Sequence, residues 1–435
     1  MYDARTEPWE TEVDSTDIAG SPVGTGSRRS LGAVYVAGAV SAMGTQMTLL
    51  ALPWLILQST GSATMTGLVF AVQVLPMALL GFLGGEVIQR LGARRTMLLA
   101  DAARGPIIAL VPALSAMDML GFGVLLVIVA VLGVLGVPYF AAQRVLATEL
   151  AGSDQKALTR ANSVLEGGFN TAAFAGPAVA GVLIALLGAE QVLWFDAASF
   201  GLSCLLLWRF VPRDAGSAQP AGTARKGMLA GVRVLLADDF LRPVMASTVT
   251  FGFLVRILGI ALPLLAFDRF GGDAAIGGLL VGGFGAGALI GSLISYLIAN
   301  RLSTARQMSL ATIQLVLPMW VLLAPVPVGV LVVALALSGA SLPLSNAPFF
   351  SILVTRFPGE IRAKVVQSVI TISNIAGPLG FLTGGVVMDR FGIAATLLIL
   401  AALSSLAAVN LLLALRRLNR PPGTARRAVP GLDMS

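Results

Sequence analysis

The chain has 435 residues, of which 56% are hydrophobic and only 12% are charged. Soluble domains carry about twice that charged fraction, so the composition excludes an ordinary soluble protein and indicates one that lies mainly in a lipid bilayer. The sequence has no His and a single cysteine, Cys204, so it lacks the commonest metal ligand and cannot form an intrachain disulfide. We therefore expect neither an enzyme nor a metal or other cofactor.

The elements predicted along the chain are apolar helices, because a segment that crosses the bilayer needs about 20 apolar residues. Residues 1–30 begin with acids rather than the basic start of a signal peptide, and we expect a disordered cytoplasmic tail there. The polar segment 212–240 is the predicted cytoplasmic loop between two six-helix bundles, at 31–211 and 241–416, and 417–435 is a basic cytoplasmic tail. The twelve predicted spans lie at 31–57, 64–88, 96–116, 119–141, 164–187, 191–211, 243–266, 275–299, 307–324, 327–350, 366–388 and 393–415.

The distribution of Lys and Arg tests this topology, because cytoplasmic loops of membrane proteins are enriched in both. Nearly all of the 29 Lys and Arg residues fall in the loops on one side. The exceptions are Arg269 and Arg390 on the other side, and Arg104 and Arg256 inside predicted spans. We therefore expect both termini in the cytoplasm and a multi-pass protein of the cell membrane. The net charge of +7 then reflects topology and not binding of nucleic acid.

A pair of glycines with one constant spacing closes the second, fifth and eleventh predicted spans. The pairs are Gly85 and Gly92, Gly181 and Gly188, and Gly385 and Gly392. These spans are the middle members of three-helix units, so the recurrence predicts an all-α membrane fold built from 3+3 inverted repeats. Chance recurrence in a chain with 49 Gly is the alternative.

Several short segments, taken together, identify a family resemblance. They are Ser41-x-x-Gly44, Ala51-Leu52-Pro53, Thr60-Gly61-Ser62, Gly85-x-x-x-Gln89-Arg90-x-Gly92-Ala93-Arg94-Arg95, Arg160-Ala161-Asn162, Gly176-Pro177, Asp196-Ala197-x-Ser199-Phe200 and Gly377-Pro378. The combination resembles the major facilitator superfamily, and within it the twelve-helix drug and macrolide exporters of the antiporter type. The resemblance implies two six-helix halves that rock about a central cavity and expose it to each side of the membrane in turn.

The loop after the second span resembles the family signature G-x-x-x-D-R-x-G-R-R, which implies a latch for the outward-facing state. Gly85, Arg90, Gly92 and Arg94 match the signature, whereas Gln89 stands where the acid belongs. Losing the interaction of that charge with a helix dipole costs about 0.3–1 kcal/mol, so we expect a weaker latch. A loop whose basic residues merely anchor the cytoplasmic side is the alternative.

The two Gly-Pro pairs are the predicted hinges. Gly176-Pro177 resembles the antiporter motif of the family and favours export, and Gly377-Pro378 is its counterpart in the eleventh span. Because proline removes a backbone donor and glycine relaxes the turn, a helix can bend at such a pair. A generic kink, which uptake carriers also contain, is the alternative.

Arg256 lies near the middle of the seventh span, where contact with lipid would cost at least about 2.5–3.5 kcal/mol, so we expect it to face the interior. The resemblance implies that the first, fourth, seventh and tenth spans line the cavity. The predicted cavity residues are therefore Arg256, Gln46, Tyr35, Tyr139 and Asn346. A structural ion pair and a misplaced edge of the span are the alternatives for Arg256.

Three embedded acids are candidates for binding the coupling proton: Asp196, Glu166 and Asp101. A carboxyl group in a low dielectric holds a proton more tightly than one in water. The spacing of Asp101 and Arg104 also predicts an i,i+3 ion pair, and a helix-end position is the alternative for the other two acids.

These observations predict a secondary transporter that exports an amphiphilic, drug-like organic molecule by proton antiport. We expect it to work as a monomer in the lipid bilayer, with a small-molecule substrate and protons as its partners. An uptake carrier for an organic anion and a membrane sensor that no longer transports are the alternatives.

Overall fold

The computed structural model describes residues 25–80, 83–152, 154–216, 233, 235–298, 301–357 and 359–418. Within these residues the chain consists of α-helices joined by turns and short irregular segments. The helices are α1 (Thr25–Thr60), α2 (Ala63–Leu80), α3 (Leu83–Leu91), α4 (Ala93–Ala116), α5 (Phe122–Ala151), α6 (Gln155–Leu187), α7 (Ala189–Phe210), α9 (Leu241–Arg269), α10 (Ala274–Ile298), α11 (Thr304–Val321), α12 (Val328–Arg356) and α13 (Gly359–Leu418).

The all-helical membrane fold is confirmed. Among the described residues, ten helices are long and apolar enough to cross a membrane. Each of the twelve predicted spans coincides with helical structure, but spans and helices do not match one to one. The second span is divided between α2 and α3, and the last two spans both lie in α13, whose backbone turns at Gly392 (φ 77°, ψ 171°). Large apolar side chains such as Leu186 and Leu317 cover the outside, as expected where lipid is the solvent.

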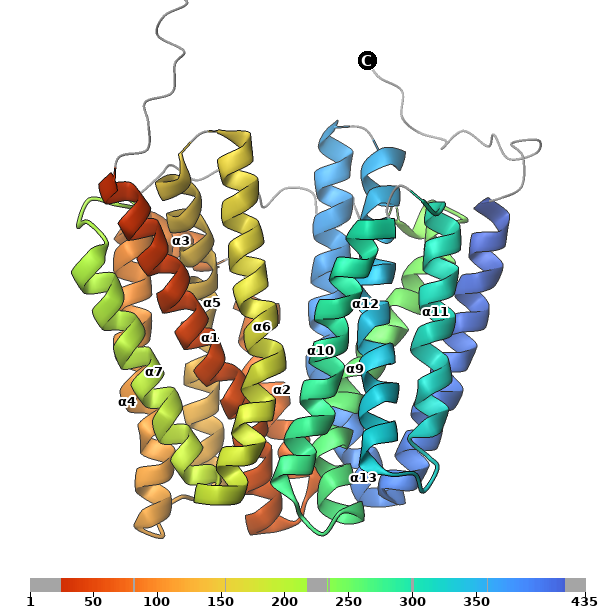
Figure 1. The fold of residues 1–435 in the computed structure, drawn as a ribbon, viewed down its shortest axis with the longest axis horizontal. Helices are drawn as coiled ribbons and strands as arrows, with labels where there is room; N and C mark the ends of the chain where they lie inside the picture. Colours follow the sequence, from red (N-terminus) through yellow and green to blue (C-terminus); the bar gives the residue numbers. More distant parts are fainter. Residues whose placement is uncertain are drawn as a thin grey trace, which may run out of the picture.

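Two groups of helices lie side by side in Figure 1, α1–α7 and α9–α13. Of the predicted tails and central loop, residues 1–24, 217–232, 234 and 419–435 lie outside the described residues. The flanking parts differ from the expectation, because α1 already begins at Thr25 and α13 continues to Leu418.

Among the described residues, the contacts between the two groups gather toward one end of the helices (Figure 1). We call this the distal end; the opposite end, where α1 begins and α13 finishes, is the terminal end (Figure 1). The contacts run between α6 and α10, between α2 and α13, and from α1 and α2 to α9. Glycines permit the close crossings: a methyl group at Gly181 of α6 would lie 2.8 Å from the Cα of Gly278 of α10.

Glycine also sets the packing inside the second group. Methyl groups at Gly287 and Gly291 of α10 would overlap the carbonyl oxygens of Ala336 and Ala340 of α12. The Gly-x-x-x-Gly repeats of this helix therefore pack α10 against its neighbours within the chain.

Candidate functional site

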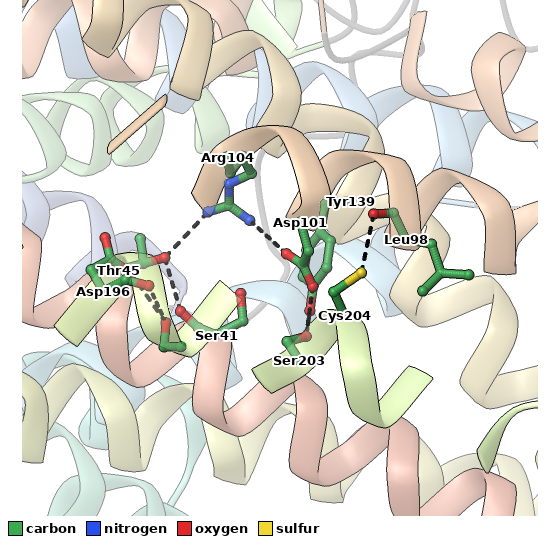
Figure 2. A network of polar contacts seen from close by, with 10 residues as sticks. Ser41, Thr45, Leu98, Asp101, Arg104, Tyr139, Asp196, Ser203 and Cys204 are labelled. Carbon is green, nitrogen blue, oxygen red and sulfur yellow. Dashed lines mark hydrogen bonds and ion pairs between the residues drawn. The ribbon is translucent and has the colours of Figure 1, made fainter. Parts of the chain in front are cut away.

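Polar side chains form a stripe on each of three neighbouring helices of the first group. The stripes consist of Ser41, Thr45 and Thr48 on α1, Asp101 and Arg104 on α4, and Asp196, Ser199 and Ser203 on α7. In each case the residues recur at intervals of three or four, so they share one face of their helix. Since α7 packs against both α1 and α4, the three stripes meet in the interior of the first group (Figure 2).

Asp101 and Arg104 form the ion pair that their spacing predicts. Arg104 Nη1 lies 3.6 Å from Asp101 Oδ1, and the two side chains are 5% and 0% exposed. Ser203 donates a hydrogen bond of 2.6 Å to Asp101 Oδ2, and Arg104 Nη2 donates one of 3.2 Å to Thr45 Oγ1. The guanidinium also lies over the ring of Phe200, 4.0 Å from its centroid. Arg104 is thus held from three helices.

Asp196 is the second buried acid of this network and is 2% exposed. Thr48 donates a hydrogen bond of 2.5 Å to its Oδ2, and Ser199 lies 3.3 Å from its Oδ1. A methyl group at Gly44 would overlap both Asp196 and Ser199, so α7 approaches α1 this closely only because residue 44 is a glycine.

The charges of the network do not balance. Arg104 is the only cation that reaches it among the described side chains, while Asp101 and Asp196 supply two carboxyl groups. The ion pair assigns the guanidinium to Asp101. An uncompensated carboxylate in a buried site is costly, so the arrangement favours one bound proton, and Asp196 is the acid without an ion pair among the described residues.

Tyr139 was predicted to line the substrate cavity and instead belongs to this network. Its side chain is 2% exposed, its hydroxyl lies 3.4 Å from Ser203 Oγ, and its ring centroid is 5.3 Å from Arg104 Cζ. The structure places this residue in the interior of the first group, because α5 turns this face toward α4 and α7.

The other predicted cavity residues lie apart from one another. Gln46 is buried where α1 crosses α6, and a methyl group at Gly176 would lie 2.6 Å from its Cβ. Tyr35 is half-buried against the core at the terminal end of the first group, and Asn346 is exposed on α12. The structure gathers no single site from these three residues.

Arg256 is exposed on α9 in the second group. Its Cζ lies 5.7 Å from the ring centroid of Phe381 on α13, and that ring stacks on Phe70 of α2 with centroids 4.8 Å apart. Among the described side chains no ion pair or hydrogen bond of Arg256 is formed. Arg256 therefore presents a guanidinium beside the aromatic contact that joins the two groups.

Glu166 differs from the other two acids. It forms an ion pair with Arg144, and the two side chains are half or more exposed. An exposed, paired carboxylate lacks the low-dielectric surroundings on which the prediction of proton binding depended.

The loop after the second span makes its contacts within the first group. Arg94 donates hydrogen bonds to the carbonyls of Val211 (2.9 Å) and Trp208 (3.2 Å), so it closes the C-terminal end of α7. Arg90 pairs with Glu86, 2.6 Å away and exposed. Gly92 has φ 80°, a backbone conformation that favours glycine. Gln89 is half-buried, and a methyl group at Gly85 would meet nothing.

The Gly-Pro pairs serve helix packing in this structure. Gly176 allows α1 to pack closely against α6. At Pro177 the neighbour is α10, since the carbonyl oxygen of Pro177 would lie 2.6 Å from a methyl group at Gly278. Gly377 and Pro378 are buried on α13 beside α9, where a methyl group at Gly377 would lie 3.7 Å from Arg256 Nε. Helix α6 runs unbroken from Gln155 to Leu187 through its pair.

Sequence reasoning treated the acids one at a time and missed Thr48 and Ser203, their hydrogen-bond donors. The signal was present in the polar stripes: a Ser or Thr at helical spacing from a buried acid marks the face that a neighbouring helix covers. What the sequence alone did not supply was which three helices meet.

Comparisons with known proteins agree with this architecture. The family described as transmembrane secretion effector, a branch of the major facilitator transporters, matches residues 22–430. The multidrug efflux pump Tap of Mycobacterium tuberculosis is 29% identical over 376 residues, which cover 85% of this chain and 89% of that pump.

Two solved structures share the fold. The nucleoside transporter NupG matches with a TM-score of 0.72 at 14% identity, covering 88% of this chain and 98% of its own. A bacterial homologue of the iron transporter ferroportin, solved in an inward-facing state, matches with a TM-score of 0.70 at 16% identity, covering 89% and 99%.

Proposed function

Because the chain belongs to the major facilitator superfamily of transporters, we propose that it exports an amphiphilic organic molecule in exchange for protons by alternating access. The observation that carries the proton part is the charge imbalance of the buried network, which contains two carboxyl groups and one guanidinium. The export part draws on the likeness to the efflux pump Tap.

Asp196 is the proposed proton carrier. As a carboxylate it accepts hydrogen bonds from Thr48 and Ser199, and as a neutral acid it removes the excess negative charge of the network. Asp101 is the proposed partner of Arg104, which fixes the guanidinium and keeps the cation from neutralising Asp196.

The terminal end is the proposed cytoplasmic end, because the basic loops gather there. In this proposal the contacts at the distal end close the outer side, and the cytoplasmic end is the one at which the two groups of helices are separated (Figure 1). In this proposal the bundles 31–211 and 241–416 move as two bodies, and one chain is sufficient for transport.

Uptake of an organic anion is a second candidate, because one observation favours it. Arg256 carries a positive charge that no acid neutralises among the described side chains, and Phe381 beside it offers an aromatic face. This pairing suits a substrate with an anionic group and an apolar body. Direction of transport separates the two candidates.

The test uses inside-out and right-side-out membrane vesicles with an imposed pH gradient and a panel of fluorescent amphiphilic dyes. We expect accumulation in inside-out vesicles that a protonophore abolishes. Asp196→Asn should abolish the accumulation driven by the gradient while downhill dye movement persists. Glu166→Gln is the matched control: it neutralises an acid of the same half that is exposed and ion-paired, and it should keep the coupling.

Accumulation of dye only in right-side-out vesicles would refute export and support uptake. Retention of full coupling in Asp196→Asn together with its loss in Glu166→Gln would move the proton site to α6. A lack of flux for every compound in the panel, from correctly folded protein, would refute the proposal of transport.

A further inference from the structure

The loop signature of the first group recurs at the other end of the molecule. Gly385-x-x-x-Asp389-Arg390-x-Gly392 of α13 repeats the pattern Gly85-x-x-x-Gln89-Arg90-x-Gly92 position by position. The closing glycines also share one backbone conformation, with φ 80° and ψ 153° at Gly92 and φ 77° and ψ 171° at Gly392. The two segments therefore form the same turn, but the acid is present only in the second copy.

Asp389 binds the start of a helix that belongs to the other group. Its Oδ1 accepts a hydrogen bond of 2.7 Å from the backbone N–H of Ala63, and its Oδ2 accepts one of 2.8 Å from that of Thr64. The hydroxyl of Ser62 donates a third bond of 2.8 Å to Oδ2. Since α2 begins at Ala63, Asp389 caps the N-terminus of α2, where unpaired N–H groups and the helix dipole favour a negative charge.

The cap lies at the tightest crossing between α2 and α13. A methyl group at Gly385 would lie 2.5 Å from the carbonyl oxygen of Ala63, and one at Gly67 would lie 2.5 Å from that of Phe381. Phe70 and Phe381 stack within the same crossing. The carboxylate reaches the backbone of α2 because these glycines let the two helices approach.

The first copy of the signature makes no such contact. Within the described part of the chain, α3 packs mainly against α4 and α5, and Arg90 pairs with Glu86 of its own helix. Gln89 has no charge to offer to a helix dipole. The distal end is thus held by an ionised cap, whereas no equivalent cap is formed among the described residues of the terminal end.

We propose that Asp389 is a positioning residue of the transport cycle: capping of α2 by α13 holds the distal end closed. The difference between Asp389 and Gln89 then favours the state in which only the distal end is closed. When the distal end opens, the hydrogen bonds from Ala63 and Thr64 to Asp389 must break, and water must replace the carboxylate at these N–H groups. This inference rests on the alternating access proposed above.

The experiment measures distances between spin labels in the full-length protein, reconstituted in lipid nanodiscs. Cys204→Ser removes the single native cysteine. One pair of cysteines, Met117→Cys and Val330→Cys, reports on the distal end, and a second pair, Gln155→Cys and Arg301→Cys, reports on the terminal end. All four positions are exposed and lie in different groups within each pair.

Asp389→Ala should raise the ratio of distally open to distally closed molecules about fivefold, the factor that corresponds to loss of one helix N-cap. Asp389→Asn keeps one acceptor oxygen without the charge, so its ratio of open to closed molecules should lie between those of the native protein and Asp389→Ala. Gln89→Asp should shift the ratio in the same direction as Asp389→Ala, by supplying the missing acid at the terminal end. The terminal pair should report shorter distances whenever the distal pair reports longer ones.

The matched control is Asp273→Ala. Asp273 also caps a helix at the distal end, accepting from the N–H groups of Ala275 (2.8 Å) and Ile276 (3.3 Å), but α10 and Asp273 belong to the same group. The Asp273→Ala variant should leave the distances unchanged.

Unchanged distances in Asp389→Ala, or an equal shift in Asp273→Ala, would overturn the inference. If two states appear on changing pH but Asp389→Ala does not alter their ratio, the proposed role of Asp389 is refuted while alternating access stands. If one state persists under all conditions, alternating access fails with it.

Discussion

Replacement of Arg104 by methionine tests whether the buried network is an ion pair that the fold depends on. The guanidinium is 5% exposed, lies 3.6 Å from Asp101 and stacks on Phe200. Removing one member of a buried pair costs about 3–5 kcal/mol, because the remaining charge is left without compensation. We expect Arg104→Met to lower the free energy of unfolding by that amount.

The double variant Arg104→Met, Asp101→Asn separates charge from packing. Replacing both members of a buried pair by neutral groups is often close to neutral, so the second substitution should restore most of the loss. Equilibrium unfolding in mixed detergent micelles, followed by circular dichroism, gives the two values. An equal loss in the single and the double variant would refute the reasoning, since it would assign the whole effect to lost packing.

Three further substitutions follow from contacts of single residues. Arg94→Ala should lower the free energy of unfolding by about 1.5–3 kcal/mol, because it removes the charged donor from the end of α7, whereas the exposed neighbour Arg95→Ala should change little; thermal unfolding compares them. Gly287→Val should cost at least about 1–3 kcal/mol by overpacking α10 against α12, and Gly201→Ala, where a methyl group meets nothing, should be neutral in the same assay. Gly44→Ala should reduce proton-driven accumulation of dye in vesicles more than downhill dye movement, because the new methyl group displaces the carboxyl group beside it.

The sequence predicts the spans well and the helix ends poorly. The predicted helix 119–141 continues to Ala151, and the predicted helix 164–187 begins at Gln155. Hydropathy marks the part of a helix that lies in hydrocarbon, while the helix itself continues into water wherever its backbone bonds are satisfied. The start of α6 carries its own signal in Asp154, whose side chain accepts a hydrogen bond of 3.0 Å from the N–H of Ala157.

Within the candidate site, contacts along one helix can be predicted from the sequence, whereas contacts between helices cannot. The pairing of Asp101 with Arg104 follows from their spacing along one helix, and the structure confirms it. The burial of Tyr139 was not predicted, because the family resemblance names the helix expected to line the cavity but not the face of that helix on which each residue lies. Contacts between helices distant in sequence, such as Asp389 with α2, depend on the crossing of two glycines, and periodicity in one helix carries no information about its partner.

Helix α1 connects the buried acids to the contact between the two groups. Its middle part supplies Thr48 to Asp196, and its distal part places Trp54 against the second group, where the ring meets Phe267 edge-on with centroids 5.9 Å apart. Trp54 is also the side chain nearest to a methyl group at Gly277, at 3.1 Å. Thr48 and Trp54 thus lie on one continuous helix, with Pro53 between them, so a displacement of α1 would affect both contacts. If Asp196 carries the coupling proton, as proposed, α1 provides a physical connection between that acid and the distal contact, and protonation can influence which end is closed without contact between Asp196 and the substrate.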